Sequence, residues 1–185
     1  MASSSSMDKL SVHEYFTTPE TLRPMELVYG FVREPPMPSY AHQRVVTRLT
    51  VRLYTHVEEL GAGEILSPID VVLDSEAALV VQPDVVYVSR DRLAIIRERI
   101  WGAPDLVVEV FSPSTAWRDR SLKLGWYRQY GVRECWFVDA GRETIEIIEL
   151  QSTTPSRVFS GAEPIRSYVL PQWTVSPDQI FAYSS

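Results

Sequence analysis

Two long stretches of the chain carry apolar residues at the spacing of a helix. Between residues 40 and 60 an apolar side chain recurs every three or four positions, and Gly61 follows as a helix-terminating residue. Another stretch, 115–130, ends just before Gly131, at a position where helices favour glycine. The pattern predicts these two helices and a shorter helix over 90–100.

Short apolar runs between the helical stretches predict strands. The run at 106–111 is apolar on both faces apart from Glu109, which is typical of a central strand. Ala140 and Gly141 separate two further runs and predict a hairpin. A strand pair or a bent strand is expected around Gly30. Strands are therefore expected over 25–32, 69–73, 84–88, 106–111, 134–139 and 144–150.

The mixture of helices and strands favours an α/β or α+β fold. A chain of 185 residues suits one domain. We expect that domain over 10–185, with a central mixed β-sheet flanked by helices. The serine-rich residues 1–9 are expected to form a disordered tail, and the proline-containing residues after 150 are expected to be irregular, with a short strand and a terminal helical turn.

The charge of the chain is unevenly distributed. Its formal net charge of −6 argues against a protein that coats nucleic acid. Between Arg90 and Arg133, however, nine Lys or Arg residues stand against five Asp or Glu residues. A solvated face and a phosphate-facing patch explain this basic segment equally well.

The sequence gives no sign of a membrane or a disulfide. No apolar run approaches the ~18 residues that a membrane span needs, so no membrane partner is expected. The single cysteine, Cys135, lies in an apolar run and is expected to be a core residue rather than a nucleophile. One cysteine allows no disulfide within the chain, which fits a cytoplasmic location.

Glu109 is the one charged residue in its predicted strand. Burying an unpaired carboxylate costs several kcal/mol or raises its pKa until the group is neutral. The surroundings must therefore supply a partner, and a cation is the natural one.

The helix predicted after this strand offers such a cation. At 100° per residue, one arc of about 140° on this helix holds both Asp119 and Lys123. The aromatic residues on the same arc are Trp126, Tyr127 and Tyr130. An inward-facing ammonium fits this arrangement, but so does a Lys123 that pairs with Asp119 at the helix edge.

Asp84 opens another predicted strand, directly after Gln82 and Pro83. An aspartate at the start of a strand is often only a turn-former. Two carboxylates on neighbouring strands near a lysine also suit Mg²⁺ or Mn²⁺, which take one or two carboxylates and keep several waters. Such an ion activates water and stabilises charge on a phosphate, while a lysine orients or deprotonates the attacking water.

Taken in order along the chain, several segments resemble one group of nucleases. They are Met25-Glu26-Leu27-Val28-Tyr29-Gly30, His42 at the start of the first long helix, Gln82-Pro83-Asp84, Pro104-Asp105-Leu106-Val107-Val108-Glu109-Val110-Phe111-Ser112-Pro113-Ser114, Asp119…Lys123…Tyr127 and Gly131-Val132-Arg133-Glu134-Cys135-Trp136. In this order and spacing, the chain from about Met25 to Phe181 resembles the PD-(D/E)xK nuclease superfamily, and more closely its Uma-two-type branch of restriction endonucleases.

The resemblance implies a restriction-endonuclease-like fold and a role for each matching residue. Asp84 and Glu109 would be metal ligands, aided by the Val110 carbonyl, with Mg²⁺ or Mn²⁺ as the cofactor. The superfamily motif places a lysine two residues after its second acid, where this chain has Phe111. In this branch the lysine looks displaced onto the following helix, which makes Lys123 its equivalent.

The same resemblance adds residues around this centre. Glu26 is expected among the catalytic residues, as a further metal or water contact. His42, Asp119 and Tyr127 are expected to bind substrate. His42 also lies on the apolar arc of its helix, where a core or capping histidine is the ordinary explanation.

These features together predict a metal-dependent phosphodiesterase that hydrolyses DNA as an endonuclease. In it, Asp84 and Glu109 hold the metal and Lys123 serves the attacking water. DNA is the expected substrate, and a homodimer would suit the cutting of both strands. Two alternatives stay open: a non-catalytic module of nuclease fold that binds DNA or protein, and metal-assisted hydrolysis of another substrate.

Overall fold

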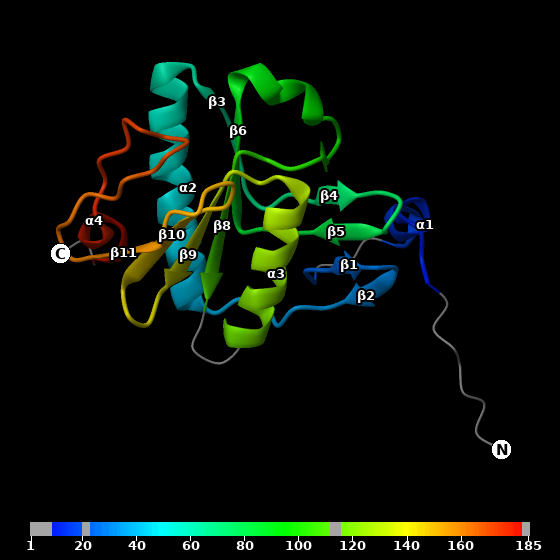
Figure 1. Cartoon of the computed structure of the whole chain (residues 1–185). Helices are drawn as coiled ribbons and strands as arrows, with labels where there is room; N and C mark the ends of the chain where they lie inside the picture. Colours follow the sequence, from blue (N-terminus) through cyan, green and yellow to red (C-terminus); the bar gives the residue numbers. More distant parts are fainter. Residues whose placement is uncertain (1–8, 20–22, 112–115, 183–185) are drawn as a thin grey trace.

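The computed structural model describes residues 9–19, 23–111 and 116–182, whose strands form two sheets (Figure 1). The larger sheet has the strand order β11-β10-β9-β8-β6-β3, and its pairs are antiparallel apart from the parallel pair β8–β9. Its strands are β3 (Gly63–Leu66), β6 (Val85–Ser89), β8 (Leu106–Phe111), β9 (Glu134–Asp139), β10 (Thr144–Glu149) and β11 (Arg157–Ser160).

The smaller sheet is built from five short strands in the order β2-β1-β5-β4-β7. Only its pair β4–β7 is parallel. Its strands are β1 (Glu26–Val28), β2 (Phe31–Arg33), β4 (Val71–Asp74), β5 (Leu79–Val81) and β7 (Ile100–Trp101). The helices of the molecule are α1 (Val12–Thr17), α2 (Tyr40–Leu60), the 3-10 helix η1 (Arg90–Ile95), α3 (Ala116–Tyr130) and α4 (Pro177–Phe181).

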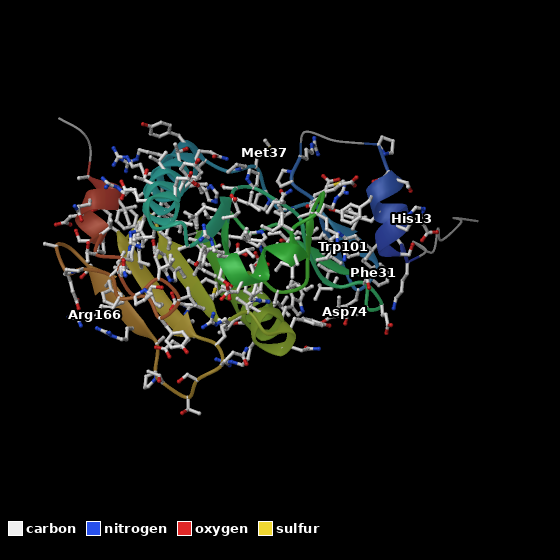
Figure 2. All side chains as sticks on the ribbon, turned by 90° about the horizontal axis from the view of Figure 1, so that it is seen from above. His13, Phe31, Met37, Asp74, Trp101 and Arg166 are labelled. Atoms are coloured by element: carbon white, nitrogen blue, oxygen red, sulfur yellow. The ribbon has the colours of Figure 1, made fainter. Side chains whose placement is uncertain are left out.

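The six-stranded sheet lies between α2 and α3, as the view from above shows (Figure 2). Alternate residues of β8 therefore enter different cores. Val108 and Val110 join the core with α2, while Val107 joins the core with α3 and the smaller sheet. Because side chains alternate along a strand, Glu109 leaves β8 on the α3 side, where a helix carries the lysine.

Local sequence explains where α2 and the first hairpin begin and end. The Ser39 side chain accepts the His42 N–H at the start of α2, and Gly61 ends the helix in a left-handed conformation. The hairpin β1–β2 turns at Tyr29 and Gly30, with φ values of 52° and 88°. A two-residue turn with both φ values positive matches the twist of the strands that it joins. This turn places Glu26 directly opposite Arg33.

The predicted fold class is confirmed: a mixed sheet carries helices on its faces. The helix predicted over 90–100 is wrong in its second half, because a 3-10 helix covers only Arg90–Ile95 and Ile96 then bridges to Ile100. The strands β3, β5 and β7 are additional to those predicted, and the five-stranded sheet depends on two of them. Residues 1–8 of the predicted tail lie outside the described residues.

Two further features agree with the sequence. Cys135 is a free thiol buried in the core of the molecule. Among the helices of the described residues, none combines the length and the apolar character that crossing a membrane requires.

Candidate active site

The carboxylate of Glu109 and the ammonium of Lys123 form a buried ion pair between β8 and α3. Lys123 Nζ lies 3.1 Å from Glu109 Oε1 and 3.0 Å from Glu109 Oε2. Both side chains are buried, with 6% of each exposed to solvent. The structure thus brings the two residues together, with the lysine on the inward face of its helix, one of the two arrangements that the spacing left open.

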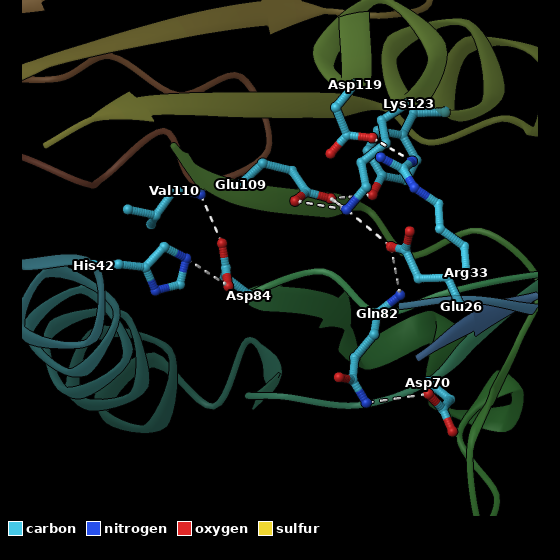
Figure 3. A network of polar contacts seen from close by, with 11 residues as sticks. Glu26, Arg33, His42, Asp70, Gln82, Asp84, Glu109, Val110, Asp119 and Lys123 are labelled. Atoms are coloured by element: carbon cyan, nitrogen blue, oxygen red, sulfur yellow. Dashed lines mark hydrogen bonds and ion pairs between the residues drawn. The ribbon is translucent and has the colours of Figure 1, made fainter. Parts of the chain in front are cut away.

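Lys123 has a second carboxylate partner in Glu26, on strand β1 of the smaller sheet. The distance from Lys123 Nζ to Glu26 Oε1 is 2.9 Å, and the Glu26 side chain is 1% exposed. The backbone N–H of Gln82 donates to the same oxygen at 3.4 Å. Glu26 Oε2 has no hydrogen-bond partner in the part of the chain that the structure describes. The ammonium therefore joins the two sheets (Figure 3).

Tyr127 completes the cluster from the next turn of α3. Its hydroxyl donates a hydrogen bond to Glu109 Oε1, and its side chain is fully buried. Burial raises the pKa of the Tyr127 hydroxyl well above its ordinary value, so the group stays a donor. Lys123 and Tyr127 together fix the orientation of the Glu109 carboxylate.

Asp84 lies beside Glu109 at the start of β6. The antiparallel register of β6 and β8 ends with Val85 opposite Val108, so Asp84 and Glu109 are the next residues along the chain beyond this pair. Asp84 Oδ2 accepts the Val110 N–H at 2.7 Å. Side chains opposite each other in a ladder share one face of the sheet. The two predicted acids are thus neighbours at the end of the β6–β8 ladder.

His42 reaches the same place from the first turn of α2. Its Nε2 lies 3.2 Å from Asp84 Oδ1. Burial alone would lower the pKa of His42, but Asp84, Glu109 and the backbone of Val110 raise it above its ordinary value. Figure 3 shows the resulting order across the site, from His42 through Asp84 and Glu109 to Lys123 and Glu26.

The buried cluster carries more carboxylates than cations. Burial raises the pKa of Glu109 to about 7, because it opposes the charged form more than Lys123 and Tyr127 favour it, and Asp84 and Glu26 add like charge. Burial would lower the pKa of Lys123, but the carboxylates around it raise the pKa above the ordinary value, so the ammonium stays charged.

This charge imbalance and the donor set suit a hard divalent cation. Carboxylate oxygens of Asp84 and Glu109 with the carbonyl of Val110 are the oxygen ligands that Mg²⁺ and Mn²⁺ take. No group of three or more His, Cys, Asp or Glu residues is arranged for a metal within the described ranges. A bound ion would therefore depend on two carboxylates, a carbonyl and water, a set that Mg²⁺ accepts.

Asp119, expected to bind substrate, has a protein partner in this structure. Arg33 Nη1 lies 2.5 Å from Asp119 Oδ1, and the pair is partly exposed. Tyr127 likewise contacts Glu109, and His42 contacts Asp84. The substrate-binding role of His42, Asp119 and Tyr127 stays a prediction.

Arg33 and Gln82 belong to this network but are not among the residues expected from the sequence. The signal for Arg33 was available: a turn at Tyr29 and Gly30 sets Glu26 opposite Arg33. Gln82 donates from its side chain to Asp70 Oδ1 at 3.2 Å, and Arg99 contacts Asp70 on the other side. These contacts hold the segment that leads into Asp84.

Several cations of the basic segment between Arg90 and Arg133 pair with carboxylates inside the protein. Arg92 and Arg133 both contact the buried Asp105, each at 3.0 Å. Arg120 lies 2.5 Å from Glu146. These pairs favour a structural explanation of the local positive charge over a phosphate-facing patch.

Comparison with known proteins identifies a family and a solved structure of the same fold. Residues 12–178 match the family Uma2, described as "Putative restriction endonuclease". A crystal structure from Anabaena variabilis, described as a "putative nuclease belonging to DUF820", is similar with a TM-score of 0.80 and 16% sequence identity. The similarity covers 94% of this chain and 98% of that one, and at this identity it shows the shared fold. No curated protein matches the chain.

The match to Uma2 extends over most of the chain and includes every residue of the cluster, from Glu26 to Tyr127. The chain therefore belongs to the Uma2 family of restriction-endonuclease-like proteins.

Proposed function

We propose that the protein is a metal-dependent endonuclease that hydrolyses phosphodiester bonds of DNA. The observation that carries this proposal is the convergence of Asp84, Glu109 and Lys123 from three separate elements. The family to which the chain belongs supports the reaction class. The position of Asp84 beside Glu109 in the sheet supports a shared ligand role for the two acids.

The metal would be Mg²⁺ or Mn²⁺, held by Asp84, Glu109 and the carbonyl of Val110. When bound, the ion supplies a polarised water and charge stabilisation on the phosphate. Two donors, Lys123 and Tyr127, keep the Glu109 carboxylate in one orientation. His42 holds Asp84 from the opposite side.

Lys123 acts as a donor rather than as a base in this proposal. Its pKa is raised by the carboxylates around it, so the amine remains an ammonium at neutral pH. An ammonium has three N–H donors and no acceptor. Lys123 can therefore orient the attacking water or neutralise charge on the phosphate, while Glu26 keeps the ammonium charged and in place.

The test is a plasmid-nicking assay with Mg²⁺ or Mn²⁺, combined with calorimetric titration of Mn²⁺. We expect nicking by the wild type and loss of both nicking and Mn²⁺ binding in Glu109→Gln. Glu98→Gln, which changes a carboxylate that is 94% exposed, is the matched control and should behave as the wild type. Equal nicking by wild type and Glu109→Gln would rule out the proposed site.

One observation favours a non-catalytic module of nuclease fold instead. Both oxygens of Asp84 already have protein partners, in the Val110 N–H and His42. If this arrangement is permanent, the wild type binds no Mn²⁺ in the titration and nicks no plasmid. Hydrolysis of small phosphodiesters in place of DNA would point to the third possibility, a different substrate for the same centre.

A further inference from the structure

Two ion pairs join the β1–β2 hairpin to α3 side by side. The outer pair is Arg33 with Asp119, at 2.5 Å, and the inner pair is Glu26 with Lys123, at 2.9 Å. On the hairpin, Glu26 and Arg33 are directly opposed across the two strands. On α3, Asp119 and Lys123 are four residues apart, which puts them on one face of the helix.

The order of the charges allows only one register between the two elements. If α3 slid by one turn, ~5.4 Å, in one direction, Lys123 would come to lie at Arg33. If it slid by one turn the other way, Asp119 would come to lie at Glu26. Either displacement brings like charges together, so the observed register is the one that satisfies both pairs.

The two pairs differ in their contact with solvent. The outer pair is partly exposed, with Arg33 at 39% and Asp119 at 22%, while Lys123 and Glu26 are at 6% and 1%. Partly exposed ion pairs contribute little to global stability. Loss of the outer pair should therefore leave the protein folded while α3 gains freedom to move along the hairpin.

We propose that Arg33 and Asp119 are positioning residues, which set the register of α3 and so hold the Lys123 ammonium between Glu26 and Glu109. The proposal rests on the proposed function, in which this ammonium serves the reaction. Neither residue touches the reacting atoms; both act through Lys123. In this role the Arg33 guanidinium stays paired with Asp119 and does not contact a phosphate.

The position of Lys123 can be measured without any nuclease activity. The rate at which an amine-reactive reagent labels Lys123 in the folded protein, followed by peptide mass spectrometry, reports how well the ammonium is held. We expect Arg33→Gln and Asp119→Asn to raise this rate about tenfold each, and the double variant to be no faster than either single one, because the two residues act as one unit.

A matched control exists on the same helix. Arg120 and Glu146 form an ion pair of the same 2.5 Å length and similar exposure, at 29% and 19%, but it joins α3 to β10. Glu146→Gln should leave the labelling of Lys123 at the wild-type rate. An equal increase in this variant would mean general loosening of α3 and would overturn the proposal, as would no increase in Arg33→Gln and Asp119→Asn.

The kinetic readout separates a positioning pair from a phosphate contact. If Arg33 and Asp119 position Lys123, both variants lower kcat by about tenfold or more with little change in KM, since small displacements of a reacting group cost that much. If Arg33 instead binds a phosphate, Arg33→Gln raises KM and Asp119→Asn lowers it, because the competing carboxylate is gone. That opposite pair of KM changes would contradict the proposal.

Failure of the proposed function is distinguishable from failure of this inference. If the wild type nicks no DNA, the proposed function fails, and the labelling rates still decide whether Arg33 and Asp119 hold Lys123. If the wild type nicks DNA and the labelling rates do not change, the inference fails while the endonuclease stands.

Discussion

The hydroxyl of Tyr127 shows how much a single buried group does at this site. It is one of two donors to Glu109 Oε1, and its side chain is fully buried. The aromatic ring packs in the core shared by α3 and the sheets. The hydrogen bond and the packing can therefore be separated by removing the oxygen alone.

We predict that Tyr127→Phe keeps the fold and lowers the free energy of unfolding by about 1.5–3 kcal/mol, the contribution of a hydrogen bond to a charged group. Tyr130→Phe is the matched control on the same helix, since its hydroxyl bonds the turn residue Asp74 near the surface. Urea unfolding of the two variants measures the difference. A loss as large in Tyr130→Phe as in Tyr127→Phe would contradict the prediction.

At the scale of residues, the sequence showed which charged groups lie among apolar neighbours, but it did not identify all of their partners. Glu109 and Lys123 were identifiable because each sits among apolar neighbours, where a charge demands a partner. The Gln82 side chain gave no such signal, because polar residues in turns and at strand ends are ordinary, and the turn at Gly30 indicated only that Arg33 lies opposite Glu26, not that it pairs with Asp119. Their roles depend on contacts between segments far apart along the chain.

At the scale of elements, the β1–β2 hairpin supports the site although it supplies only Glu26 directly. Its turn needs a positive φ of 88° at Gly30. A Cβ at Gly30 would lie 2.9 Å from the Cβ of Lys9 and 3.2 Å from the Leu10 carbonyl oxygen. The Gly30 carbonyl also accepts the Leu10 N–H at 2.8 Å. Glycine is therefore required here by both conformation and space.

We predict that Gly30→Ala lowers the free energy of unfolding by more than about 1 kcal/mol, as expected for alanine at a positive φ. Gly125→Ala is the control of opposite sign: Gly125 is an exposed residue within α3, and nothing lies within 4 Å of an added Cβ. Alanine there should stabilise by about 0.5–1 kcal/mol. Thermal unfolding of both variants tests the pair, and a stabilised Gly30→Ala would refute the account of the turn.

The sequence predicted the long elements and missed several of the short strands for a physical reason. α2, β8, β9 and β10 have enough residues for a period to be visible. β5 and β7 have three and two residues, too few for any alternation. Their existence depends on pairing with distant strands, as where Leu27 pairs with Val80. β3 likewise has only four residues, Gly63–Leu66.

At the scale of the whole molecule, the buried carboxyls make the free energy of unfolding depend on pH. Carboxyls with raised pKa values reduce stability as pH rises, and a carboxyl with a lowered pKa reduces stability as pH falls. Burial raises the pKa of Glu109 to about 7, and it also raises the pKa values of Asp70 and Glu134. A carboxyl whose pKa is higher in the folded state stabilises the fold while protonated. That contribution is present below the unfolded pKa and is lost as pH rises through the folded value.

We predict that, without divalent ions, the free energy of unfolding falls between about pH 4.5 and pH 7, and that Glu109→Gln flattens this part of the curve. Urea unfolding at several pH values measures both curves. A wild-type curve that rises over this range, or an unchanged slope in the variant, would contradict the prediction.

Asp105 provides the control at lower pH. Burial would raise its pKa, but hydrogen bonds from Ser89, Arg133 and Arg92 lower it below its ordinary value. The stability that it contributes is present above the unfolded pKa, ~3.9, and is lost as pH falls through the folded value. Asp105→Asn should therefore change the acid limb of the curve and leave the slope above pH 4.5 as in the wild type.

The bridge from Glu26 through Lys123 to Glu109 also has a consequence for the order in which the protein is assembled. Contacts between segments distant in the chain form late, because a long loop must close first. A folding intermediate with α3 packed on β8 but the hairpin undocked would contain Asp84, Glu109 and Lys123 and still hold its ammonium by one carboxylate only. Docking of the hairpin is therefore the step that gives the Lys123 ammonium its second carboxylate and completes the bridge between the two sheets.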